Sequence, residues 1–426
     1  LPDCRWHSSM FAIVSFGLLV CWSNAVGGLI LAQLKELGWT DNSTTATFSA
    51  ITTAGMFLGA LVGGIIGDKT GRRNAFILYE AIHIASMVVG AFSPNMDFLI
   101  ACRFVMGVGL GALLVTLFAG FTEYMPGRNR GTWSSRVSFI GNWSYPLCSL
   151  IAMGLTPLIS AEWNWRVQLL IPAILSLIAT ALAWRYFPES PRWLESRGRY
   201  QEAEKVMRSI EEGVIRQTGK PLPPVVIADD GKAPQAVPYS ALMTGVLLKR
   251  VILGSCVLIA MNVVQYTLIN WLPTIFMTQG INLKDSIVLN TMSMFGAPFG
   301  IFIAMLVMDK IPRKTMGVGL LILIAVLGYI YSLQTSMLLI TLIGFFLITF
   351  VYMYVCYASA VYVPEIWPTE AKLRGSGLAN AVGRISGIAA PYAVAVLLSS
   401  YGVTGVFILL GAVSIIVAIA IATIGI

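Results

Sequence analysis

The chain has 426 residues, of which 57% are hydrophobic and only 11% are charged, and its mean hydropathy is +0.79. A soluble domain carries about 25% charged residues, so this composition excludes an ordinary water-soluble enzyme or binding module. The formal net charge of +8 does not indicate nucleic acid as a partner, because the Lys and Arg residues gather in a few short loops between apolar runs.

The apolar runs predict an all-α membrane protein with twelve transmembrane helices. A helix needs about 20 residues to cross the hydrocarbon of a bilayer, and all its backbone groups must be hydrogen-bonded within the segment. The first run is too long for a cleaved signal peptide and is interpreted as a span. The predicted spans lie near residues 11–34, 45–67, 74–93, 98–123, 132–157, 165–187, 249–277, 286–308, 315–333, 337–362, 373–398 and 402–426.

A polar insert separates six predicted spans from six. It defines an N-terminal bundle at residues 1–187, a linker with short helices at 188–247 and a C-terminal bundle at 248–426. Basic residues cluster in alternate loops, near residues 69–73, 128–130, 310–314 and 372–374. Basic loops stay in the cytoplasm, so the linker and both termini are expected there.

The two halves repeat a turn with one acid and several bases. GDKTGRR at residues 67–73 follows the second span, and MDKIPRK at 308–314 follows the eighth, the second of its own half. Parallel repeats of this kind enclose a site near the bilayer midplane. Together with RFVMGVGLG at 103–111, PESPRWL at 188–194 and PEIWP at 364–368, these turns resemble the sugar-porter, organic-ion and aromatic-acid branches of the major facilitator superfamily.

The resemblance covers essentially the whole chain. Overall, the sequence looks like the metabolite transporters of bacterial inner membranes. It implies two six-helix bundles, alternating access and a monomeric secondary transporter in the inner membrane, not an enzyme. The sequence shows no metal cluster, no nucleophile–base pair and no ATP-binding motif. A gradient is therefore expected to drive transport, and no cofactor is expected.

Charged residues at the cytoplasmic ends of the spans form a predicted gating network. In the resembled family the first basic turn latches one state of the transporter, and acids can pair there with Arg side chains or helix N-termini. The alternative is that the bases only set the topology. The residues assigned to the network are Asp68, Arg72, Arg73, Arg130, Glu189, Arg192, Asp309, Arg313, Glu365 and Arg374.

Arg384 is the predicted anchor for the substrate. It lies ten residues beyond Arg374, about 15 Å along a helix, which places it near mid-membrane, where a charge needs a partner or an aqueous cavity. The resembled organic-anion carriers have Arg at this place, and a guanidinium can bind a carboxylate by two hydrogen bonds. The structural alternative is an Arg capped by backbone carbonyls.

Amides and aromatic rings of other spans are expected to complete the cavity. Aromatic walls with a few amides suit a small polar organic solute, although hydrogen bonds between helices would use the same residues. The amides of span seven favour a sugar or polyol, whereas Arg384 favours an anion. The expected lining residues are Trp22, Asn24, Asn142, Trp143, Asn262, Gln265, Tyr266, Asn270, Trp271, Tyr354, Tyr357 and Asn380.

Proton coupling has four candidate residues: Glu80, His83, Arg103 and Glu123. Proton-coupled sugar porters carry an acid in span one, where this chain has Ser23, so coupling by that acid is excluded and Arg103 must find another partner. Glu80 and His83 are three residues apart and share a helical face, which suits a proton relay. Span three is peripheral in the resembled fold, however, which favours a structural pair.

Three functions remain open from the sequence. The first is a transporter for a small organic anion, with proton symport as an option. The second is a symporter or facilitator for a neutral sugar or polyol. The third, from another class, is a substrate sensor that has a transporter fold but moves nothing.

Overall fold

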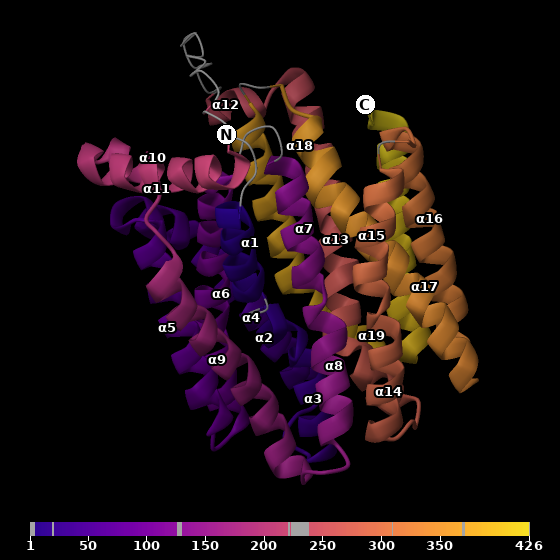
Figure 1. The fold of residues 1–426 in the computed structure, drawn as a ribbon. Coiled ribbons are helices and arrows are strands. Elements are labelled where there is room, and N and C mark those ends of the chain that lie inside the picture. The colour runs from indigo at the N-terminus through magenta and orange to yellow at the C-terminus, as the bar shows by residue number, and fades with distance from the viewer. Residues whose placement is uncertain are drawn as a thin grey trace. The chain divides into compact units, whose positions relative to one another are not determined.

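The computed structural model describes residues 5–18, 21–125, 130–219, 222, 238–308, 310–368 and 371–425. In this part of the chain every regular element is a helix (Figure 1). The N-terminal helices are α1 (Arg5–Leu18), α2 (Trp22–Ala25), α3 (Gly27–Glu36), α4 (Asn42–Thr70), α5 (Arg72–Ala91), α6 (Met96–Tyr124), α7 (Arg130–Asn142), α8 (Ser144–Leu155) and α9 (Ala161–Tyr186).

The predicted linker contains three helices: α10 (Pro191–Ser196), α11 (Tyr200–Thr218) and α12 (Tyr239–Leu242). The C-terminal part consists of α13 (Gly245–Thr278), α14 (Leu283–Met294), α15 (Gly296–Val307), α16 (Arg313–Ser332), α17 (Met337–Cys356), the π-helix η2 (Tyr357–Tyr362), α18 (Val363–Glu365) and α19 (Lys372–Ile424).

The helix lengths agree with twelve spans. Ten helical segments of the described residues are long and apolar enough to cross a membrane. One of them, α19, has 53 residues, which at 1.5 Å per residue is about 80 Å and far too long for one crossing. Gly402 breaks it, with φ +66° and ψ −160°, so α19 holds the last two predicted spans. The fifth predicted span is divided between α7 and α8.

The chain divides into two compact units that cut across its sequence halves. Unit one comprises Leu1–Asn24, Gly55–Ser144 and Leu169–Asp230, and unit two comprises Ala25–Ala54, Tyr145–Gln168 and Gly231–Ile426. Unit two thus joins segments of spans one, two, five and six to the whole C-terminal half. In it, α3 packs against α13 at Gly28, where an added Cβ would lie 2.4 Å from the carbonyl oxygen of Ile269.

Glycines bring the helices of each half into backbone contact. In unit one, an added Cβ at Gly59 of α4 would lie 2.0 Å from the carbonyl oxygen of Val108 in α6. In unit two, an added Cβ at Gly300 of α15 would lie 2.3 Å from the carbonyl oxygen of Thr349 in α17. Small residues allow such approaches between membrane helices. Both contacts join the second and fourth spans of a half, in keeping with the predicted internal repeat.

Candidate functional site

The first basic turn is held by contacts to the linker within unit one. Asp68 pairs with Arg72, with 2.6 Å between Oδ1 and Nη1. Its backbone carbonyl accepts hydrogen bonds from the indole Nε1 of Trp193 at 2.7 Å and from the guanidinium of Arg197 at 2.6 Å. The prediction did not include Trp193 and Arg197, although Trp193 belongs to the PESPRWL motif on which the resemblance rests.

Glu189 lies on the N-terminus of α5. Its Oε1 accepts the backbone N–H of Arg72 at 2.6 Å, and its Oε2 accepts the backbone N–H of Arg73 at 3.3 Å. A carboxylate is stabilised there by the free N–H groups and by the helix dipole. Gly71 precedes the helix with φ +94°, and an added Cβ at Gly71 would lie 2.2 Å from Oε2 of Glu189. The guanidinium of Arg73 donates to the carbonyl of Trp184.

The second basic turn has an ion pair at the matching place in unit two. Arg313, the first residue of α16, donates from Nε to Oε2 of Glu365 at 2.9 Å and from Nη2 to Oε1 at 3.2 Å. Such a two-point contact fixes both side chains. Of the other predicted gating residues, Arg192 is exposed and Arg374 is half-buried. Asp309 and the side chains of Arg130 and Glu123 lie outside the described part of the chain.

Arg384 lies on α19, close to the polar part of α13. The neighbouring Gly383 packs on Asn262, and Gly387 packs on the ring of Tyr266. The side chain of Arg384 is half-buried. Among the described residues, no acid and no backbone carbonyl forms an ion pair or hydrogen bond with it. These residues therefore provide no carbonyl that caps Arg384.

The remaining predicted lining residues of unit two differ in exposure. Gln265 and Tyr266 are half-buried and Asn380 is exposed, with its Nδ2 donating to the carbonyl of Ser376. Asn270 and Trp271 are buried, and Gly28 of α3 packs on Asn270. The fully buried rings of Tyr354 and Tyr357 stack at 5.8 Å, and the Tyr354 hydroxyl donates to the carbonyl of Val257.

The other four predicted lining residues belong to unit one. Trp22 and Asn24 are buried in α2 and flank Ser23. Asn142 donates from Nδ2 to the carbonyl of Ser138 at 2.8 Å. Trp143 is 36% exposed and packs edge-on against Phe139. The structure therefore brings the predicted residues together as two sets, one in each unit.

Three of the four candidate proton residues, Glu80, His83 and Arg103, lie in one buried cluster of unit one. Nε2 of His83 lies 2.8 Å from Oγ of Ser23, and Nδ1 lies 3.7 Å from Oε2 of Glu80 and 3.4 Å from Oγ of Ser176. Arg103 donates from Nη1 to the carbonyl of Ser23 at 2.8 Å. His83 thus contacts span one through Ser23 and also lies beside Glu80. Ser176 of α9 has no motif that could have marked it.

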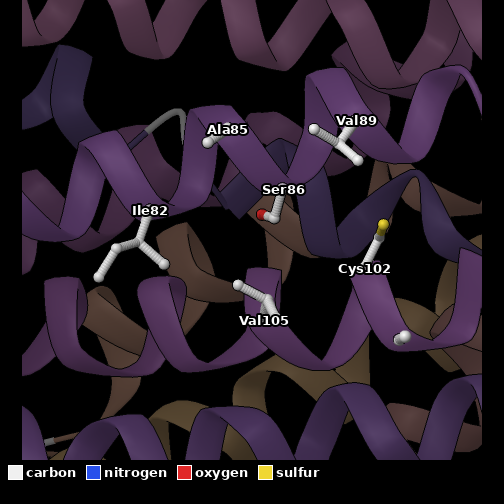
Figure 2. Close-up of a pocket in the computed structure, with 7 residues that line it drawn as sticks. Ile82, Ala85, Ser86, Val89, Cys102 and Val105 are labelled. Atoms are coloured by element: carbon white, nitrogen blue, oxygen red, sulfur yellow. The ribbon is translucent and has the colours of Figure 1, made fainter.

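An apolar cavity in unit one is unsuited to a polar solute. Its volume is about 420 Å³, and it lies between α5 and α6. Figure 2 shows the residues that line it. Its walls carry no charged group, which disfavours it as the transport site. Its lining residues are Ile82, Ala85, Ser86, Val89, Ala101, Cys102 and Val105. Among the described residues no group of three or more His, Cys, Asp or Glu side chains could hold a metal ion.

Comparison with known proteins identifies the family. The model of the Major Facilitator Superfamily matches residues 11–391. The chain is 99% identical over 426 residues to YdjK of Escherichia coli (strain K12), described as a metabolite transport protein, covering 100% of this chain and 93% of YdjK. It is 43% identical over 429 residues to the inner membrane metabolite transport protein YdjE of the same organism, covering 100% of this chain and 94% of YdjE.

Among solved structures, the partially occluded inward open conformation of the xylose transporter XylE from E. coli superposes with a TM-score of 0.76 at 17% identity, covering 97% of each chain. This likeness concerns the fold. The family match extends over most of the chain. The chain therefore belongs to the Major Facilitator Superfamily and is an integral-membrane transporter, not an enzyme.

Proposed function

We propose that this transporter carries a small organic anion, a carboxylate, and that Arg384 binds it. The observation that carries the proposal is the half-buried guanidinium on α19, deep in a membrane span and without an ion pair among the described residues. A charge at such a depth costs about 2.5–3.5 kcal/mol on insertion scales. Binding of an anionic substrate during transport would explain why a charged residue is present there.

The site includes the amide and aromatic groups beside Arg384. Asn262 and Tyr266 contact the same stretch of α19 through Gly383 and Gly387, so they can orient the organic part of a carboxylate that Arg384 holds by two hydrogen bonds. These groups also support the alternative substrate, a neutral sugar or polyol, since amides bind hydroxyl groups well. The charge on Arg384 favours the anion.

The transport cycle proposed here is alternating access between bundles at residues 1–187 and 248–426, joined by a cytoplasmic linker at 188–247. The ion pairs of Asp68 with Arg72 and of Arg313 with Glu365 would stabilise one state at the cytoplasmic face. The basic loops favour cytoplasmic termini. The name of YdjE supports the bacterial inner membrane as the location, and a monomer is the expected form.

The test is uptake of labelled solutes into proteoliposomes, with a panel of small carboxylates set against sugars and polyols. We expect uptake of a carboxylate, lost in Arg384→Ala and weakened in Arg384→Lys by about 1.5–3 kcal/mol in affinity, because Lys keeps the charge but not the planar fork. Arg208→Lys, on the exposed surface of α11, is the matched control and should transport normally.

Three outcomes would contradict the proposal. If only neutral solutes enter the vesicles, the sugar or polyol alternative stands. If folded Arg384→Ala carries the carboxylate as the wild type does, Arg384 is not the group that binds it. If a solute binds to the purified protein but none crosses the membrane, the chain is a sensor on a transporter fold.

A further inference from the structure

The buried cluster around His83 contains the carboxyl group of Glu80. Glu80 is fully buried, and the described residues give neither of its carboxyl oxygens a hydrogen bond by geometry. The imidazole Nδ1 of His83 lies 3.7 Å from Oε2 of Glu80. An ionised carboxylate without donors is costly to bury, so the proton on this group is part of the site.

His83 connects Glu80 to span one. Its Nδ1 faces Glu80 and Ser176, and its Nε2 faces Ser23 at 2.8 Å. An imidazole can accept a proton on one ring nitrogen and release one from the other. The hydroxyl of Ser176 lies close to both the Glu80 carboxyl and His83 Nδ1, so it can bridge the 3.7 Å between these two groups. Ser23 is flanked by Trp22 and Asn24, the proposed cavity residues of unit one.

Arg103 places a permanent charge at the far end of this chain of groups. It is 2% exposed and donates from Nη1 to the carbonyl of Ser23 and to the sulfur of Met106. Cys21, which precedes α2, is a further ionisable side chain near Glu80. The cluster is therefore assembled from four segments: the middle of span one, α5, α6 and α9.

We propose that Glu80, His83 and Ser23 form a proton-binding and relay centre, with Arg103 as its fixed cation. Glu80 gives its proton to Nδ1 of a neutral His83, and Nε2 releases its own proton to Ser23. The Ser23 hydroxyl then passes one proton on toward Trp22 and Asn24, the proposed cavity residues of unit one. The ring ends neutral in its other tautomer, Glu80 ends as a carboxylate, and one proton has moved. The use of this centre as the coupling site rests on the transport function proposed above, whereas the centre itself does not.

The experiment measures proton binding directly and needs no substrate. Infrared difference spectra of the purified protein in lipid vesicles, taken between about pH 5 and about pH 9, report the carbonyl band of a protonated carboxyl group. We expect a buried glutamic acid band in the wild type, shifted by ¹³C-labelled glutamate, that disappears on the alkaline side. Glu80→Gln should lose this band, and Asp97→Asn, an exposed acid of α6, should keep it.

His83→Asn keeps the carboxyl group and removes the ring, so the band should persist with its titration midpoint moved by about one pH unit or more. This variant decides the test if Glu80→Gln does not fold. A wild type without a titrating glutamic acid band, a band that Glu80→Gln leaves in place, or a midpoint that His83→Asn leaves unmoved would overturn the proposal. Failure of carboxylate transport would leave all these spectra unchanged, so the two proposals fail separately.

Discussion

At the scale of single residues, Glu189 shows how the linker is fixed on unit one. It lies 117 positions from Arg72, yet its carboxylate caps the helix that begins there. Gly71 makes room for it, because a side chain at this position would enter the space of the Glu189 oxygens. The sequence placed both motifs in one network, since an acid suits a helix N-terminus. It could not say which acid would occupy the helix end, because that depends on how the linker folds back.

Gly71→Ala should destabilise the protein more than Gly198→Ala. Both glycines have positive φ, +94° and +72°, but nothing lies within 4 Å of an added Cβ at Gly198. Each substitution costs about 1–3 kcal/mol in backbone strain, and only Gly71→Ala also displaces Glu189. Thermal unfolding in detergent measures the difference.

A double variant tests whether the contact with Glu189 is what makes Gly71→Ala more costly. In Glu189→Gln the displaced charge is already gone, so adding Gly71→Ala should cost less than it does in the wild type, since residues in contact do not contribute additively. Equal losses for Gly71→Ala and Gly198→Ala, or full additivity with Glu189→Gln, would contradict the importance of this contact.

The buried cluster shows that contacts between residues far apart in the chain could not be predicted from the sequence. Glu80 and His83 could be paired from their spacing on one helix, but Ser23 lies 60 positions from His83 and Ser176 lies 93 positions away. Only the packing of span one and α9 against α5 brings them together. The same holds for Arg103, which bonds a backbone carbonyl that no side-chain pattern could mark.

At the scale of elements, the spans were predictable because their length and apolarity are set by the bilayer. What the sequence did not reveal are the local departures from the α-helix. The π-helix η2 follows α17 and precedes Pro364, and α7 and α8 divide the fifth span near Trp143. Such departures depend on contacts with neighbouring helices, and the apolar pattern on either side of them is the same.

Gly59→Ala should destabilise the protein and Gly64→Ala should not, although both residues lie on α4. An added Cβ at Gly59 would lie 2.0 Å from the carbonyl of Val108, whereas nothing lies within 4 Å of one at Gly64. We expect Gly59→Ala to force α4 from α6 and cost about 1–3 kcal/mol, as overpacking does. Gly64→Ala should cost nothing, since Ala is the better helix former. Unfolding temperatures in detergent test this, and equal temperatures would contradict the close approach of the two helices.

At the scale of the whole molecule, the composition of unit two bears on the transport cycle. It contains residues 25–54 and 145–168 of the N-terminal half beside the C-terminal helices. Nδ2 of Asn290 in α14 donates to Oγ of Ser149 in α8 at 3.0 Å. If the two bundles rock against each other, this contact between the sequence halves must open once in each cycle.

A disulfide at this contact should therefore stop transport reversibly. In a background without the six native cysteines, Ser149→Cys with Asn290→Cys should transport when reduced and lose turnover when oxidised, because the bond prevents α8 from leaving α14. The matched control is Ser293→Cys with Gly344→Cys, which joins α14 to α17 inside the C-terminal half, where an added Cβ at Gly344 lies 2.5 Å from Oγ of Ser293. This pair should remain active when oxidised, since both helices move together. Full turnover of the oxidised first pair, with the bond verified by mass spectrometry, would show that these segments stay together throughout the cycle and that access alternates in another way.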